Sequence, residues 1–151
     1  MRYERIEYPG SDGATVPAYR LTPSGAGPHP AVLVVHGHDD SGAGVVGVKD
    51  GYADEIGKHG AGAGFVGPAP DFRSFGDVKP EGRGHYGAQG VPDYLREEGN
   101  DVFLRVAIND ARRAHEVLRA SPNVDLRRVG IIGISLGGII TLVTAAIETE
   151  I

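Results

Sequence analysis

Short runs of consecutive apolar residues recur along the chain, separated by polar and glycine-rich stretches. The clearest run occupies 31–35, and weaker ones follow at 64–68 and 129–134. Apolar runs of this length without alternation are typical of strands buried on both faces of a parallel sheet. Two earlier segments, 2–8 and 14–21, flank a Pro-Gly-Ser-Asp-Gly turn and predict short strands. The pattern therefore predicts a pair of short strands followed by three buried strands.

Helical periodicity appears between and after these buried runs. The strongest case is 102–118, where apolar residues recur at helical spacing and Asn100 stands in front as a candidate N-cap. A short helix is expected over 51–59, and an apolar helix over 136–147. The polar, aperiodic stretch 75–99 is expected to be a long loop with one turn near its end. The order β-β-β-α-β-α-β-α favours an α/β fold with a largely parallel sheet.

Composition narrows the possible partners and compartments. The chain has 151 residues, the size of one domain, and a formal charge of −5, so neither nucleic acid nor a membrane surface is an expected partner. The absence of cysteine excludes disulfides and thiolate chemistry. The first residues are polar, and no segment approaches the roughly 18 apolar residues of a membrane-spanning helix. We therefore expect a cytoplasmic protein. The 24 glycines gather in the predicted loops, where a site would be built.

A serine motif lies between the last predicted strand and the last predicted helix. It reads Gly133-Ile134-Ser135-Leu136-Gly137. A serine hydroxyl becomes a nucleophile when a base takes its proton and hydrogen-bond donors receive the oxyanion. Small residues at both ends of such a motif allow the sharp turn that exposes the hydroxyl. The alternative interpretation is an ordinary N-cap serine between a strand and a helix.

A second motif, His36-Gly37-His38-Asp39-Asp40, directly follows the predicted strand 31–35. The two motifs in these contexts resemble the α/β-hydrolase superfamily, most closely its dienelactone-hydrolase and acetyl-xylan-esterase branch. The resemblance extends over most of the chain, including 70–76, the helix bearing Asp110, and 124–130. It implies a three-layer αβα fold with a mostly parallel sheet of the α/β-hydrolase type.

The resemblance also implies a reaction and the residues that carry it. The reaction is hydrolysis of a small carboxylic ester through an acyl-enzyme on Ser135, without cofactor or metal. The backbone N–H groups of Leu136 and His38 would form the oxyanion hole. The remaining motif residues would shape the oxyanion loop and the elbow: His36, Gly37, Gly133 and Gly137.

Two members of the implied catalytic triad are missing after the serine. In α/β hydrolases an Asp or Glu and then a His follow the nucleophile, yet residues 136–151 contain neither Asp nor His, and Glu148 and Glu150 are the only acids there. Among the six preceding histidines, His85 is the one placed to act as a surrogate base, and no partner acid is apparent. We therefore expect a single incomplete domain over 1–151, truncated after the elbow helix. Such a chain would be weakly active or inactive alone, and whether it is an enzyme is left open.

Two further hypotheses compete with the serine esterase. His36, His38 and Asp40 match the core of a metal-binding motif and would make the chain a metal-dependent hydrolase. A hydrolase-like binding module without catalysis is the other possibility. In the incomplete esterase and in the binding module alike, the strand 129–134 would have a bare edge, and the chain could self-associate through this edge. Two smaller expectations are that Asp71 and Arg73 lie in a solvated loop and that His115 lies on the solvated side of its helix.

Overall fold

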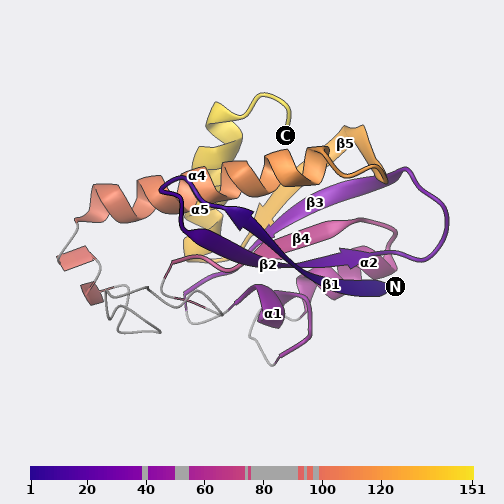
Figure 1. Ribbon diagram of the computed structural model, residues 1–151, viewed down its shortest axis with the longest axis horizontal. Coiled ribbons are helices and arrows are strands. Elements are labelled where there is room, and N and C mark those ends of the chain that lie inside the picture. Colours follow the sequence, from indigo (N-terminus) through magenta and orange to yellow (C-terminus); the bar gives the residue numbers. More distant parts are fainter. Residues whose placement is uncertain (39–40, 50–54, 74, 76–91, 94, 97–98) are drawn as a thin grey trace.

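Figure 1 shows the computed structural model of the chain. It describes residues 1–151 except 39–40, 50–54, 74, 76–91, 94 and 97–98. The strands are β1 (Arg2–Pro9), β2 (Thr15–Thr22), β3 (His29–Val35), β4 (Gly67–Pro70) and β5 (Val124–Gly133). The helices are α1 (Gly42–Val45), α2 (Ile56–Gly62), α4 (Asn100–Arg119) and α5 (Leu136–Ile147).

The strands lie side by side in the order β1-β2-β4-β3-β5. β2 pairs antiparallel with β1 and with β4, and β3 pairs in parallel with β5. Two backbone hydrogen bonds of 2.8 Å join the two halves, from Val32 N to Val66 O and from Val66 N to Pro30 O. β5 has no second neighbour among the strands that the structure describes. The apolar run that predicted a strand buried on both faces is therefore the centre of the parallel part.

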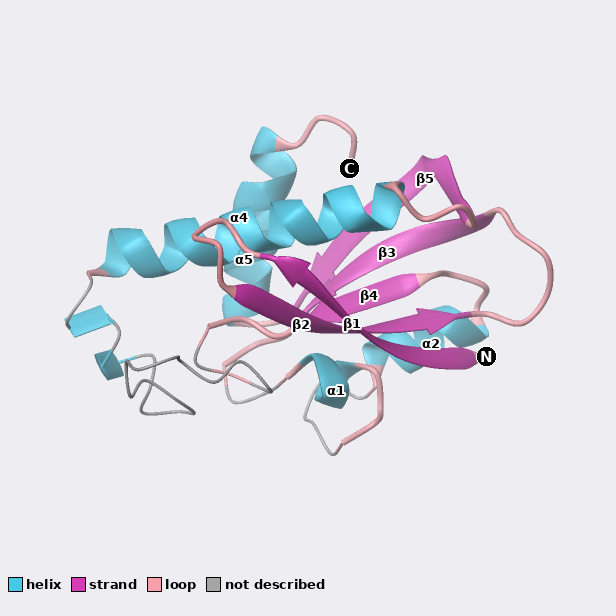
Figure 2. Cartoon of the chain, in the orientation of Figure 1, coloured by secondary structure: helices cyan, strands magenta, loops and turns pink. Residues whose placement is uncertain are grey.

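Helices cover both faces of this sheet, as Figure 2 shows. Leu33 and Val35 of β3 pack into one apolar cluster with side chains of α4 and α5. Val34, which points to the other face, packs with Val45 of α1 and with Ala61 of α2. Alternate residues of β3 thus pack into two separate apolar clusters, one on each face of the sheet. The predicted three-layer α/β fold is confirmed.

Element boundaries differ from the sequence predictions where glycines set them. The helix expected over 51–59 is observed as α2, and residues 51–54 lie outside the described part. The helix ends at Gly62 and not at Gly60, with Ala63 as the C-cap and Gly64, whose φ is +94°, as the residue after it. Hydrogen bonds from Phe65 N to Gly60 O and from Gly64 N to Ala61 O complete a Schellman motif. Because this motif occupies 64–65, β4 begins at Gly67, three residues later than predicted from the apolar pattern.

Two predictions about the long helix are wrong. Asn100 is the first residue of α4, and the N-cap position belongs to Gly99 with φ +92°. His115 is not solvated: it is 2% exposed, and its Nε2 has no hydrogen-bond partner among the described residues. Burial lowers the pKa of His115, and the nearby carboxylate of Glu148 opposes that shift. None of the helices in the described ranges is long and apolar enough to cross a membrane.

His115 should give the fold a pH-dependent stability. Because its pKa is lowered on folding, the unfolded chain takes up a proton at higher pH than the folded chain does. Stability is therefore complete above the ordinary histidine pKa and falls as the pH drops through it. We expect the urea midpoint to decrease from about pH 7.5 to about pH 5.5, and His115→Leu to flatten that decrease. Substitution of the exposed His59 by Gln is the control; an unchanged slope in His115→Leu would contradict the prediction.

Candidate active site

Ser135 occupies a sharp turn between the end of β5 and the start of α5. Its backbone has φ 54° and ψ −120°, a conformation that non-glycine residues rarely adopt. Holding a residue there costs on the order of 1–3 kcal/mol. Ser135 is exposed, and although it stands at the N-cap position of α5, its side chain makes no capping hydrogen bond. The ordinary N-cap interpretation therefore does not account for this serine.

Two glycines allow this turn to pack against the end of β3. A Cβ atom on Gly137 would overlap the carbonyl oxygens of Val35 and His36. A Cβ atom on Gly133 would overlap the Gly137 carbonyl and the Thr141 hydroxyl. Ile134 N also donates to Val35 O at 3.3 Å. The turn thus lies directly against the backbone from which the predicted oxyanion loop, His36 to His38, departs.

The ring of His36 is fixed by the backbone on both sides. It is 1% exposed, and its Nε2 accepts a hydrogen bond from Phe72 N at 3.1 Å. The ring proton is therefore on Nδ1, which lies 2.8 Å from the carbonyl oxygen of Gly37 and donates to it. His36 is held as the neutral Nδ1–H tautomer. Neither nitrogen can bind a metal without breaking a backbone hydrogen bond.

The metal hypothesis gains no support from the described residues. They contain no cluster of three side chains able to hold a metal ion. Asp40, the carboxylate of the proposed HxHxD motif, lies outside the described residues, as does His85, the proposed surrogate base.

Two aromatic rings pack beneath the oxyanion loop. The ring centroid of His36 lies 5.1 Å from that of Phe72 and 5.4 Å from that of Phe75. The ring of His38, which is half-buried, also lies 5.4 Å from Phe75 in an edge arrangement. The segment after β4 therefore forms the floor of the loop, which the sequence did not indicate.

Asp71 and Arg73 do not lie in a solvated loop, contrary to the sequence prediction. Asp71 is fully buried and accepts a hydrogen bond from Gly42 N at 2.6 Å. Arg73 is 9% exposed and donates from Nε to Asp110 Oδ2 at 2.8 Å and from Nη2 to Asp12 Oδ1 at 2.8 Å. Burial raises the pKa of Asp110, and the Arg73 guanidinium opposes that shift. One signal was present: Asp110 falls within the apolar stripe of its helix.

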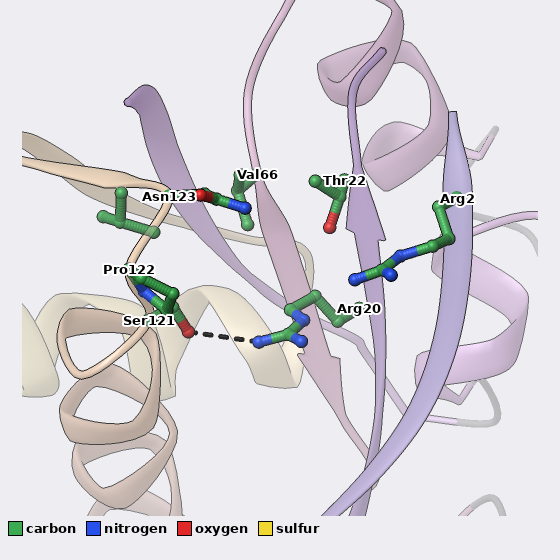
Figure 3. A pocket seen from close by; sticks show the side chains of 8 residues that line it. Arg2, Arg20, Thr22, Val66, Ser121, Pro122 and Asn123 are labelled. Atoms are coloured by element: carbon green, nitrogen blue, oxygen red, sulfur yellow. Dashed lines mark hydrogen bonds between the residues drawn. The ribbon is translucent and has the colours of Figure 1, made fainter. Parts of the chain in front are cut away.

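A small pocket lies at the opposite end of the sheet, near the start of β5 (Figure 3). Arg20 and Ser121 are among the residues that line it. Arg20 pairs with Glu4 at 2.7 Å and donates to the Ser121 hydroxyl at 3.1 Å. Ser135 follows the other end of β5, so this pocket is separate from the serine turn.

Comparison with known proteins places the chain in a family. A scan against protein families matches residues 2–151 to the family described as acetyl xylan esterase (AXE1). The chain belongs to the acetyl xylan esterase family. The resemblance inferred from the two sequence motifs is confirmed. No curated protein matches the chain.

Solved structures agree with the family in fold. A putative acetyl xylan esterase from Bacteroides fragilis aligns with TM-score 0.81 and 22% identity, over 99% of this chain and 42% of its own. Acetyl xylan esterase 1 from Thermoanaerobacterium sp. gives TM-score 0.69 and 25% identity, over 97% and 44%. A cold-adapted esterase from an Arctic intertidal metagenomic library gives 0.73 and 22%, over 99% and 57%. The chain therefore spans roughly half the length of the structures it matches.

Proposed function

We propose that this chain carries the nucleophile and oxyanion hole of a carboxylic-ester hydrolase acting through a Ser135 acyl-enzyme. The observation that carries the proposal is the strained backbone of Ser135, φ 54°, held against the end of β3 by Gly133 and Gly137. Strain of this kind is retained where an exposed nucleophile needs it. Membership of the acetyl xylan esterase family supports an acetylated saccharide as the proposed substrate class.

The proposed reaction has two steps. Ser135 Oγ attacks the acyl carbonyl carbon while a base takes its proton, and the alcohol leaves with a proton returned by that base. Water then attacks the acyl-serine, releasing the carboxylic acid and restoring the hydroxyl. The oxyanion formed in each step accepts hydrogen bonds from the N–H groups of Leu136 and His38. Leu136 opens α5, so the positive end of the helix dipole also favours the oxyanion.

Neither His36 nor His115 is free to act as the base. His36 is committed to the backbone through both nitrogens, and His115 is buried within α4. Residues after Ser135 contain neither His nor Asp. No cofactor or metal is required by this chemistry.

Acylation of Ser135 tests the proposal without requiring full turnover. The chain is incubated with 4-nitrophenyl acetate, with and without imidazole as an external base, and the acetylated residue is located by mass spectrometry. We expect acetylation at Ser135, accelerated about tenfold or more by imidazole and abolished in Ser135→Ala. Ser121→Ala, at the opposite end of the sheet, is the matched control. Equal labelling of the chain and Ser135→Ala would reject the proposal and favour a non-catalytic binding module.

A further inference from the structure

We infer that Arg73 is a positioning residue for the oxyanion hole, acting through Phe72 and His36 on the N–H group of His38. The inference rests on the proposed function for its catalytic meaning, because the hole is part of that proposal. The Arg73 side chain is hydrogen-bonded to Asp110 and Asp12, which lie outside both the serine turn and the oxyanion loop. Its effect travels through four consecutive short-range links.

The first link is the anchor of Arg73 itself. Its guanidinium joins the fully buried Asp110 of α4 to Asp12 in the turn between β1 and β2, with donor–acceptor distances of 2.8–3.3 Å. Ser11 N also donates to Asp110 Oδ1 at 3.1 Å. A Cβ atom on Gly10 would overlap the guanidinium, so the turn is shaped around it. Helix α4 and the turn between β1 and β2 thus hold one buried cation between them.

The second link is the backbone between Arg73 and Asp71. Asp71 N donates to Pro17 O at 2.9 Å, and the Asp71 carboxylate receives Gly42 N at 2.6 Å. Phe72 therefore lies between two residues whose side chains are both buried and hydrogen-bonded. This arrangement fixes the direction of the Phe72 N–H group, which points at His36 Nε2.

The third link is the tautomer of His36. Because Nε2 accepts from Phe72, the proton stays on Nδ1 and is donated to the Gly37 carbonyl. If Phe72 N–H moved away, the proton would no longer be confined to Nδ1. The Gly37 carbonyl would then lose its donor.

The fourth link is the planar peptide between Gly37 and His38. In a trans peptide the C=O and N–H bonds point in opposite directions. Since the Gly37 carbonyl is held toward the His36 ring, the His38 N–H is directed away from that ring. The orientation of the second proposed oxyanion donor is therefore set by His36 and, behind it, by Arg73. Removal of the cation would leave the Asp110 carboxylate buried without its partner and would release the segment.

Nuclear magnetic resonance of the His36 ring tests this relay without any catalysis. In the unmodified chain we expect the ¹⁵N signature of a pure Nδ1–H tautomer and a single backbone amide signal from His38. Arg73→Gln should populate the Nε2–H tautomer and shift or split the His38 amide signal. Arg73→Lys, which keeps the charge but not the fork of donors, should give an intermediate result. If Arg73→Gln fails to fold, Asp12→Asn removes only the outer contact and should move both signals in the same direction by less.

Arg20→Gln is the matched control, because Arg20 also joins a carboxylate and a distant segment but at the opposite end of the sheet. At equal loss of thermal stability it should leave the His36 tautomer and the His38 amide signal unchanged. Unchanged His36 signals in Arg73→Gln, or equal changes in Arg20→Gln, would overturn the inference. Slower acetylation of Ser135 in Arg73→Gln than in Arg20→Gln would tie the relay to the reaction. A tautomer change without any Ser135 acetylation in the parent chain would refute the proposed function but not the relay.

Discussion

Gly137→Ala is expected to lower the free energy of unfolding by about 3 kcal/mol or more, enough to unfold a marginal domain. The added Cβ atom would overlap two backbone carbonyl oxygens, those of Val35 and His36. Neither oxygen can rotate away, because both belong to the backbone at the end of β3. Relief would require α5 to move off the sheet and the turn at Ser135 to open. Urea denaturation followed by circular dichroism measures the change.

The neighbouring glycine gives the matched control for that substitution. A Cβ atom on Gly138 would lie 3.6 Å from the Gly133 carbonyl oxygen, an ordinary contact. Because Gly138 lies inside α5, alanine there should be neutral or stabilising by up to about 1 kcal/mol. Both variants add the same methyl group to the same helix. Equal stabilities would show that the close packing of the turn on β3 is not what holds it.

The elements that the sequence predicted well are those whose pattern is local. β3 reads as an uninterrupted apolar run because it is buried on both faces, and α5 has the predicted bounds, 136–147. The serine turn was also readable, because its glycines are required by contacts within a few residues and with one neighbouring strand. Strand order, by contrast, depends on which segments meet, and the apolar pattern does not give it.

The features that the sequence did not reveal depend on distant partners. Arg73 looked like a loop residue because Asp110 and Asp12, which bury it, lie far away along the chain. His115 was predicted to lie on the solvated face of its helix. It is buried because α5 packs against α4, and the sequence of α4 does not indicate where α5 packs. The tautomer of His36 likewise depends on Phe72. Charged residues that become buried need their partners, and sequence spacing does not identify them.

Self-association through the face formed by β5 and α5 is the second large effect that we expect. Helix α5 contains no charged residue, and a helix that is apolar all round is normally buried. Here Ile139, Leu142, Val143 and Ile147 are exposed along one stripe, with Leu142 at 74%. The edge of β5 beside them has no strand neighbour within the described ranges. We propose that a second copy covers this face in the isolated chain.

Leu142→Glu should weaken that association about a hundredfold or more, since each copy would lose a buried leucine worth about 1.5–3 kcal/mol. Sedimentation velocity over a range of concentrations measures the association, with Val48→Glu as control, because Val48 is 47% exposed beyond α1 on the other face of the sheet.

Hydrogen exchange along the free edge of β5 gives a second measurement of the same association. Ile134 N–H points to β3, so by alternation the N–H groups of Val129 and Ile131 point to the free edge. Their hydrogen exchange should slow as concentration rises; a chain that stays monomeric, or one equally affected by Val48→Glu, would contradict association through this face.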